Sequence, residues 1–446
     1  MTLFAWRRRQ NWIIIGVLYA LFMMSRYNYS AISPLLLDAF GWDKTDLSLL
    51  ETAMPFFYGL SVLINATIVD RIGGRKAYLI GSAGVVLANL VFGAGHFAIL
   101  TAPAVIDGVA NPATFIGGLS PRQMAYAMSA VWAVNAYFQS FGAMAIIKIN
   151  SQWFAPNERG TFSAIFGVLI RFGIVLAFSG VPLIAAVTGK WYWGFWIPAM
   201  LVAAFACLDY FFVKDKPEEA GYKAVIADEK AKKEKPNTIE LIKGVVGNRK
   251  VLTFALASIM IGFVRRSIVD SWWPLYLKEV LGVSGTSLIP QIMPWGIAIL
   301  GIAGGFALGP LSDKLGRRAP VIGVGFLGMA GGLVLFYLVG ANSLGGWETV
   351  ICLSILSFFV NGVHGVLMGA ASMDLGGKRG SASVAGVFDG AQYFFAAPFT
   401  GLLVGYITKN FGWDTWKLWP VPFALIGFLL MLTLWNEKSE KSGGGH

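Results

Sequence analysis

Two stretches of similar sequence decide the fold: Gly59–Lys76 reads GLSVLINATIVDRIGGRK, and Gly301–Arg318 reads GIAGGFALGPLSDKLGRR. In each stretch an apolar run leads into an Asp-basic-x-Gly turn, which is followed by paired basic residues. Glycine permits a tight turn, and clustered Lys and Arg favour the cytoplasmic side of a membrane. A signature that occurs once in each half of the chain therefore indicates an internal repeat of two membrane-embedded halves.

The composition also indicates a membrane protein. Of the 446 residues, 56% are hydrophobic and only 13% are charged, whereas a soluble domain has about 25% charged residues. About twelve apolar runs of roughly 20 to 27 residues recur, the length that a helix needs to cross the hydrocarbon layer. We therefore expect an all-α membrane protein with about twelve transmembrane helices in two six-helix, pseudo-symmetric halves. The expected spans are residues 11–37, 45–69, 77–98, 122–148, 161–187, 193–213, 251–277, 288–311, 319–340, 347–373, 381–407 and 418–435.

A charged, Lys- and Glu-rich segment separates the two groups of six spans. The predicted organisation is an N-terminal half (1–213), a cytoplasmic linker (214–250), a C-terminal half (251–436) and a tail (437–446) that ends in a Gly-Gly-Gly-His remnant. Basic residues collect at every second loop, which predicts a multi-pass protein of the cell inner membrane with both termini in the cytoplasm. This topology accounts for the net charge of +11, so no nucleic-acid partner is expected.

The two repeated loops resemble the cytoplasmic loop motif of the major facilitator superfamily, and the resemblance extends over nearly the whole chain. The matching residues are Asp70, Arg71, Gly74 and Arg75 in the first copy and Asp313, Gly316 and Arg317 in the second. The resemblance implies alternating access around a site at mid-depth between two halves. From the residues alone, simple anchoring by basic loops is the alternative, but two copies at matching positions favour a transporter.

Charged side chains within the expected spans are candidate functional residues, because a charge at the bilayer centre costs about 2.5 kcal/mol or more. Arg26 and the pair Arg265/Arg266 lie near the middle of the first span of each half, so the repeat predicts that they face one another across a central cavity. Facing guanidinium groups repel unless an anion lies between them, and their planar forks suit phosphate or carboxylate. The other candidates are Arg171, Asp270 and Asp389, with Lys148 and Glu51 nearer helix ends.

The two adjacent arginines of the seventh span have different expected partners. Asp270 is four residues beyond Arg266 and should share its helical face, so it can neutralise Arg266. Arg265 should point about 100° away, which leaves it for the cavity. Arg26 has no acid within one helical turn.

Five segments resemble the organophosphate:phosphate antiporters, which include the bacterial glycerol-3-phosphate and hexose-phosphate transporters. They are Met24–Pro34, which begins MSRYNY, Lys148–Gly160 (KINSQWFAPNERG), Asp215–Tyr222 (DKPEEAGY), Val264–Glu279 (VRRSIVDSWWPLYLKE) and Gly405–Asp414 (GYITKNFGWD). The resemblance implies that Arg26 is the first phosphate-binding arginine. It leaves the second open, because spacing to Asp270 selects Arg265 whereas spacing to Pro274 selects Arg266. The chain departs from the family at Ile170, where glycerol-phosphate members have histidine, and at Val62, where they have lysine, so the cargo stays open.

The remaining candidates each have two interpretations. Asp389 is either a proton-coupling carboxylate or a counter-ion for Arg171 or Lys148. His364 either has a functional role, in which it binds a phosphoryl oxygen or shuttles a proton, or it is a packing residue. Four further residues either donate hydrogen bonds into the cavity or pack in the core: Tyr29, Tyr137, Gln139 and Tyr393.

The sequence thus predicts a secondary active transporter of a small organic anion, most simply a phosphate ester exchanged for inorganic phosphate. The alternatives are a proton-coupled carboxylate or sulfonate symporter that uses Asp389 or Glu51, and a transporter-like anion sensor. We expect no enzymatic activity, because the sequence contains no recognisable arrangement of a nucleophile, a general base or metal ligands. The two cysteines, Cys207 and Cys352, are too few for a metal site or a disulfide framework. We expect no cofactor, a monomer, and as partners only the anionic substrate and the lipid bilayer.

Overall fold

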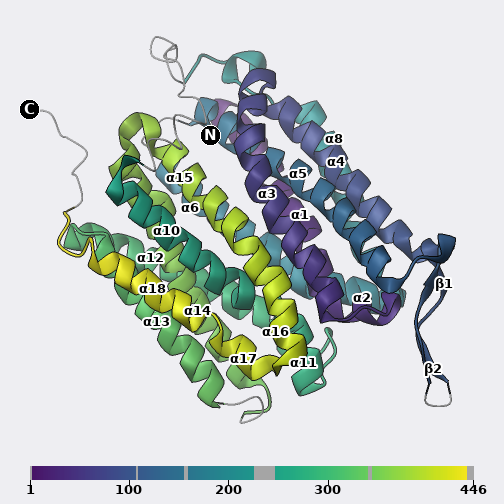
Figure 1. The fold of residues 1–446 in the computed structure, drawn as a ribbon. Helices are drawn as coiled ribbons and strands as arrows, with labels where there is room; N and C mark the ends of the chain where they lie inside the picture. Colours follow the sequence, from purple (N-terminus) through teal and green to yellow (C-terminus); the bar gives the residue numbers. More distant parts are fainter. Residues whose placement is uncertain (1–2, 107–108, 155–158, 226–246, 340–343, 439–446) are drawn as a thin grey trace, which may run out of the picture. The chain divides into compact units, whose positions relative to one another are not determined.

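The computed structural model describes residues 3–106, 109–154, 159–225, 247–339 and 344–438, and it is mostly helical (Figure 1). This confirms the all-α prediction. The chain divides into two compact units, unit 1 (Met1–Gly41 and Leu60–Lys235) and unit 2 (Trp42–Gly59 and Pro236–His446). The helix α3 (Lys44–Ile72) begins in unit 2 and ends in unit 1.

Unit 1 is built on α1, which packs against α6 and α8, and on α4, which packs against α5 and α8. A capping box starts α5, because the Ser120 hydroxyl accepts from the Gln123 N–H and the Gln123 side chain accepts from the Ser120 N–H. The α-helices of this unit, besides the end of α3, are α1 (Leu3–Ala31), α2 (Ser33–Phe40), α4 (Gly74–Ala94), α5 (Pro121–Trp153), α6 (Arg159–Val175), α7 (Val181–Thr188) and α8 (Trp193–Phe212). A π-helix, η3 (Leu176–Gly180), joins α6 to α7, and short 3-10 helices are η1 (Gly95–Ala98), η2 (Ile116–Gly118) and η4 (Pro217–Ala220).

A short β-ribbon connects α4 to α5 in unit 1 (Figure 1). Its strand β1 (Ile99–Thr101) pairs with β4 (Thr114–Phe115), and β2 (Ala104–Ile106) pairs with β3 (Val109–Asn111), both antiparallel. The sequence predicts only a connection between two spans here. Alternation of β-branched residues with small ones over so few positions is too short a signal to predict strands.

Unit 2 has its main packing contacts between α12 and α14, between α13 and both α14 and α18, and between α10 and both α15 and α18. Its α-helices, besides the start of α3, are α10 (Arg249–Val264), α11 (Trp273–Leu281), α12 (Leu288–Leu315), α13 (Ala319–Val339), α14 (Trp347–Gly365), α15 (Ser372–Pro398), α16 (Val404–Asn410), α17 (Gly412–Leu418) and α18 (Val421–Leu432). Three π-helical segments interrupt them: η6 (Arg265–Val269), η7 (Val366–Ala371) and η8 (Phe399–Leu403).

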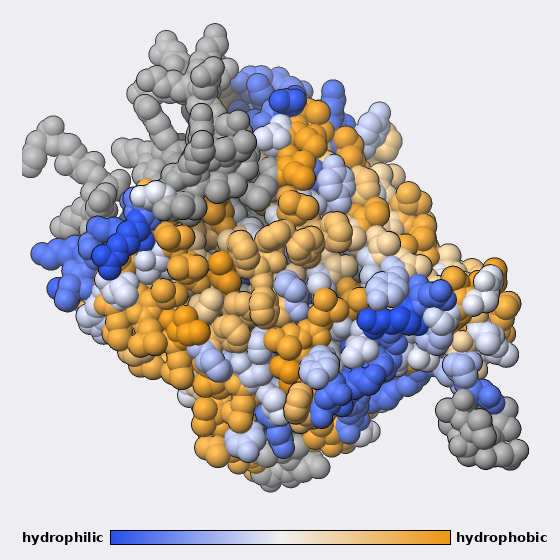
Figure 2. Space-filling view, viewed as in Figure 1, coloured by the Kyte–Doolittle hydropathy of each residue, from blue (hydrophilic) through white to orange (hydrophobic). Residues whose placement is uncertain are grey.

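Nine helices in the described part of the chain are long and apolar enough to cross a membrane, or ten if the bent α3 is one span. The expected spans 11–37 and 381–407 are helical over most of their length but are not among these. Figure 2 shows apolar side chains over much of the visible face. Leu87, Phe306 and Leu338 are 62%, 65% and 71% exposed, as expected for helices that contact lipid tails.

A close helix crossing in unit 2, between α12 and α14, makes a stability prediction. A Cβ built on Gly304 would lie 1.9 Å from the Phe358 carbonyl oxygen, whereas a Cβ on the adjacent Gly305 meets nothing within 4 Å. Gly304→Ala must therefore push α12 away from α14, which costs about 1–3 kcal/mol. Thermal unfolding of the purified protein should show a lower midpoint for Gly304→Ala, while the control Gly305→Ala stays near the parent. Equal midpoints for the two variants would contradict this close packing.

Candidate functional site

The two adjacent arginines of unit 2 lie on a π-helical turn. Arg265 begins η6, and the Asp270 N–H donates to the Arg265 carbonyl oxygen at 2.9 Å, five residues apart. After this turn the helix breaks, and α11 starts again with Pro274 in its first turn. Proline has no N–H to continue the preceding helix, which explains why the expected span 251–277 is interrupted. Single π-turns of this kind occur frequently at functional sites.

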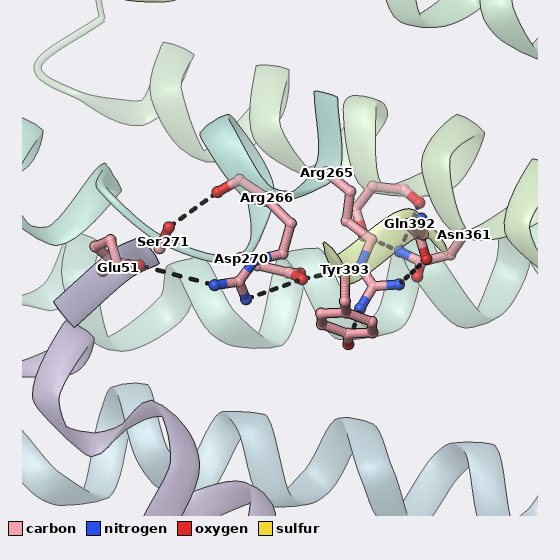
Figure 3. A network of polar contacts seen from close by, with 9 residues as sticks. Glu51, Arg265, Arg266, Asp270, Ser271, Asn361, Gln392 and Tyr393 are labelled. Carbon is pink, nitrogen blue, oxygen red and sulfur yellow. Dashed lines mark hydrogen bonds and ion pairs between the residues drawn. The ribbon is translucent and has the colours of Figure 1, made fainter. Parts of the chain in front are cut away.

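Arg265 is held at all three of its guanidinium nitrogens (Figure 3). Its Nε donates to Asp270 Oδ2 at 2.8 Å, its Nη1 to Gln392 Oε1 at 3.3 Å and its Nη2 to the Tyr393 hydroxyl at 2.6 Å. The side chain lies against the Tyr393 ring, 5.4 Å from its centroid, and the residue is 8% exposed. One acceptor is thus a carboxylate, and the other two are neutral.

Arg266 is compensated by two carboxylates. Its Nη2 lies 3.8 Å from Glu51 Oε2, and its Nη1 lies 3.9 Å from Asp270 Oδ2. Both Arg266 and Glu51 are only 2% exposed, so the charges compensate one another in a setting that water barely reaches. Figure 3 shows Glu51 entering this network from the first part of α3.

The predicted division of partners is therefore corrected. The sequence predicts that Asp270 neutralises Arg266 and leaves Arg265, but the shorter contact of Asp270 is with Arg265. The reason is the π-turn: it widens the helix so that residues five apart, rather than four, come together. Periodicity at 3.6 residues per turn could not reveal this. The expected ion pair of Arg266 with Asp270 is present at 3.9 Å, and Glu51, which is far away in sequence, adds a second carboxylate at 3.8 Å.

In unit 1, Arg26 lies on α1 and is 2% exposed. Gln139 Oε1 accepts from its Nε at 3.4 Å and from its Nη2 at 3.3 Å. The other end of the same amide, Gln139 Nε2, donates to the Phe22 carbonyl at 3.1 Å. The structure thus brings together Arg26 and Gln139, two of the residues predicted from sequence.

Two of the predicted tyrosines are engaged in aromatic packing. Tyr29 is buried with its ring 5.3 Å from the ring of Trp132. Tyr137 contacts Phe138 and Phe141 at 5.2 and 5.6 Å between ring centroids. Packing is one of the two interpretations for these residues, and a binding role stays a prediction.

Lys148 contacts Asp70 of the first loop motif. Its Nζ forms an ion pair with Asp70 Oδ1 at 2.9 Å, and both side chains are about one-third exposed, 34% and 33%. Lys148 lies more than two helical turns beyond Gln139 on α5, which separates it from Arg26. Its placement therefore differs from that expected for a substrate ligand at mid-depth.

The first loop motif is hydrogen-bonded to the end of α8 and to the segment that follows it. The Arg75 N–H donates to Asp215 Oδ1 at 2.7 Å, and the Arg75 side chain donates to the Tyr210 carbonyl. Gly73 has φ 91°, a conformation that favours glycine, and a Cβ there would lie 2.8 Å from Asp215 Oδ2 and so would also displace this carboxylate. Asp215 caps the start of α4, a role that the sequence analysis did not assign.

The second loop motif uses a different arginine from the one predicted. Gly316 ends α12 with φ 60°. Arg318, rather than Arg317, donates to Asp313 and to Asp374, with 2.8 Å between Arg318 Nε and Asp374 Oδ2. Burial lowers the pKa of Arg318, but its hydrogen bonds to Asp374 and Asp313 outweigh burial and raise it. Arg71 is exposed, and Arg317 is half-buried.

Arg171, His364 and Asp389 are half-buried on α6, α14 and α15. Each takes part in interactions within the protein. Their coupling, counter-ion and ligand roles stay predictions. Within the described residues, no group of three or more His, Cys, Asp or Glu side chains could hold a metal ion.

A family model of the Major Facilitator Superfamily matches residues 15–400. The chain belongs to the Major Facilitator Superfamily. It is therefore a multi-pass membrane protein with a transporter fold, and the predicted superfamily is confirmed. Among solved structures, a bacterial homolog of the human lysosomal transporter Spinster has a TM-score of 0.72 at 15% identity, covering 98% of this chain and 99% of that one. The D-xylose-proton symporter gives 0.71 at 14% identity, covering 98% and 99%. These similarities show the fold alone.

Relatives within the superfamily confirm the resemblance to organophosphate:phosphate antiporters. The chain is 25% identical to the glycerol-3-phosphate transporter of Bacillus subtilis, over 97% of this chain and 94% of the relative. It is 24% identical to a probable hexose phosphate transport protein of Chlamydia muridarum, over 95% and 90%. It is also 25% identical to the membrane sensor protein UhpC of Salmonella typhimurium, over 97% and 93%.

The buried ion network makes a prediction that does not depend on transport. Glu51→Gln removes one of the two carboxylates around Arg266 and leaves a charge imbalance in a site that is 2% exposed. We expect the unfolding midpoint of the purified protein to fall by more than about 3 °C. The control is Glu218→Gln, an exposed acid on η4, which should leave the midpoint unchanged. A Glu51→Gln midpoint equal to that of the parent would contradict the compensating role of Glu51.

Proposed function

We propose that this protein is a secondary active transporter that exchanges a phosphate ester for inorganic phosphate by alternating access. Arg26 and Arg265 bind the anion, with no covalent chemistry and no cofactor. Two relatives of similar length are described as transporters of glycerol 3-phosphate and hexose phosphate. The Lys and Arg distribution along the chain supports placement in the inner membrane with both termini cytoplasmic. The carrier acts as a monomer in the lipid bilayer, with a small anion as its partner and no nucleic acid.

The observation that carries this proposal is the asymmetry between the two adjacent arginines. Arg266 faces two carboxylates, whereas both terminal nitrogens of Arg265 bond neutral acceptors. A neutral acceptor yields to an anion more readily than a carboxylate does, because it has no net negative charge to attract the guanidinium, whereas an incoming anion has. Arg265 is therefore the arginine of unit 2 whose terminal nitrogens can exchange their neutral partners for an anion.

Arg26 has a similar environment in unit 1. Its Nε and Nη2 both bond the neutral amide oxygen of Gln139, at 3.4 and 3.3 Å. A guanidinium remains charged at any working pH, and its planar fork matches two oxygens of a phosphoryl group. One such arginine from each half of a repeat supports a shared anion site.

Exchange follows from charge. A dianion makes charge-assisted hydrogen bonds to Arg26 and Arg265 and so stabilises the states through which the carrier must pass, whereas the empty carrier lacks these bonds. A ligand shifts a conformational equilibrium only by its differential affinity for the two states. The loaded carrier therefore reorients faster than the empty one, which couples outward movement of one anion to inward movement of another.

Transport in proteoliposomes tests this function. Vesicles loaded with phosphate should accumulate labelled phosphate or glycerol 3-phosphate faster than empty vesicles. Arg26→Ala and Arg265→Ala should each reduce uptake by more than about 100-fold, since each removes a charge-assisted bidentate contact. Arg249→Ala, which removes an exposed arginine at the start of α10, is the control and should transport normally. Uptake that ignores internal phosphate but follows an imposed pH gradient would contradict exchange and indicate proton symport.

A sensor is the second candidate, because one relative at 25% identity is described as a membrane sensor protein. The same vesicles separate the two functions. A purified protein that binds phosphate but moves none of it across the bilayer would favour sensing, and rapid exchange excludes sensing as the sole role.

A further inference from the structure

Gln392 carries a buried amide group with one end unused. The residue lies on α15 beside Tyr393 and is 1% exposed. Its Oε1 accepts from Arg265 Nη1 at 3.3 Å, but its Nε2 is buried and has no acceptor among the described residues. A guanidinium has only donors, so the amide must present its oxygen to Arg265 and turn its nitrogen away. The unused donor is therefore a consequence of the contact with Arg265.

The stem of Gln392 is fixed by close helix packing. A Cβ built on Gly262 of α10 would lie 2.9 Å from Gln392 Cγ and 2.7 Å from its carbonyl oxygen. Glycine at position 262 thus lets α10 approach α15 where Gln392 crosses it. Because the stem is confined, only the terminal amide is free to turn, and its last torsion is broad and costs little.

A second glutamine provides an internal comparison. Gln139 also presents its amide oxygen to an arginine, but its Nε2 donates to the Phe22 carbonyl at 3.1 Å. That amide is satisfied at both ends. A buried donor without a partner is costly, so the difference indicates that Gln392 meets an acceptor in another state of the carrier.

We propose that Gln392 and Tyr393 are placeholder ligands of Arg265, which accept its hydrogen bonds when the site is empty and donate to the cargo phosphoryl group when it is filled. This inference rests on the proposed function. An amide presents a donor after a half-turn, and a tyrosine hydroxyl is donor and acceptor alike. Asp270 is suited to the complementary task, since an ionised carboxylate only accepts. It holds Arg265 Nε at 2.8 Å and keeps the guanidinium oriented while Nη1 and Nη2 change partners.

The chemistry distinguishes glutamine from side chains of similar size at this position. Gln392→Glu replaces the amide by a carboxylate, which would pair with Arg265 and repel an incoming anion. Gln392→Met fills the space but neither accepts nor donates a strong hydrogen bond. The first change should weaken anion binding strongly, and the second should weaken it less and should not prevent reorientation.

Calorimetric titration of the purified full-length protein tests the proposal, with inorganic phosphate and with glycerol 3-phosphate as ligands. Gln392→Met and Tyr393→Phe should each weaken the binding of both ligands about tenfold, since each removes one hydrogen bond to a charged group. Gln392→Glu should weaken it more than about 100-fold, because it adds a negative charge beside the anion. In vesicles, Gln392→Met should raise KM by a similar factor while the maximal exchange rate stays within about twofold. Gln291→Met, on α12 with its amide bonded to the Gly285 carbonyl, is the control and should bind like the parent.

The outcomes separate this inference from the function on which it rests. If the parent protein binds neither phosphate nor the ester, the proposed function fails and this inference fails with it. If the parent binds and folded Gln392→Met and Tyr393→Phe bind equally well, the placeholder role is wrong while the transport function stands. A variant that lowers the unfolding midpoint but leaves affinity unchanged would show a purely structural role and overturn the proposal.

Discussion

The structure depends on keeping guanidinium charge in a place that water barely reaches. Burying an ion costs several kcal/mol unless a counter-charge and hydrogen bonds compensate it. In unit 2 this is achieved by two arginines and two acids, Arg265, Arg266, Asp270 and Glu51, each no more than 8% exposed. The compensation is uneven, because Asp270 serves both arginines and Glu51 lies near Arg266. Two carboxylates therefore compensate the charge of Arg266, whereas Arg265 bonds one carboxylate through Nε and neutral groups through Nη1 and Nη2.

Backbone geometry creates this arrangement. The π-turn η6 brings Arg265 beside Asp270, and the break before Pro274 ends the regular helix directly after the acid. Gly262 lets α10 approach α15, so that Gln392 and Tyr393 reach the guanidinium. A widened turn has little stability of its own and is retained where packing and buried polar contacts hold it.

The class of fold and the identity of the buried charged residues could be predicted from the sequence. Which of these charges pair with one another could not. Long apolar runs and the repeated Asp-basic-x-Gly loop predicted a helical membrane protein of this superfamily, because hydropathy and turn chemistry are local properties. The expected ion pair of Asp270 with Arg266 is present, but the shorter contact of Asp270 with Arg265 was not predicted, since a π-turn leaves no periodic signal. The contacts of Arg318 with Asp374 and of Asp215 with the start of α4 were missed because they join distant segments. Gln392 was missed because a glutamine in an apolar span has no distinguishing pattern until its partner is known.

If an anion takes the place of Gln392 and Tyr393 on Arg265 while Asp270 stays bound, an experimental structure of the purified protein in saturating phosphate will show this exchange of ligands. We expect a phosphate within hydrogen-bond distance of Arg265 Nη1 and Nη2, with Asp270 still accepting from Nε and the Gln392 nitrogen turned toward the anion. A phosphate bound elsewhere, with Arg265 keeping its bonds to Gln392 and Tyr393, would show that the exchange does not occur.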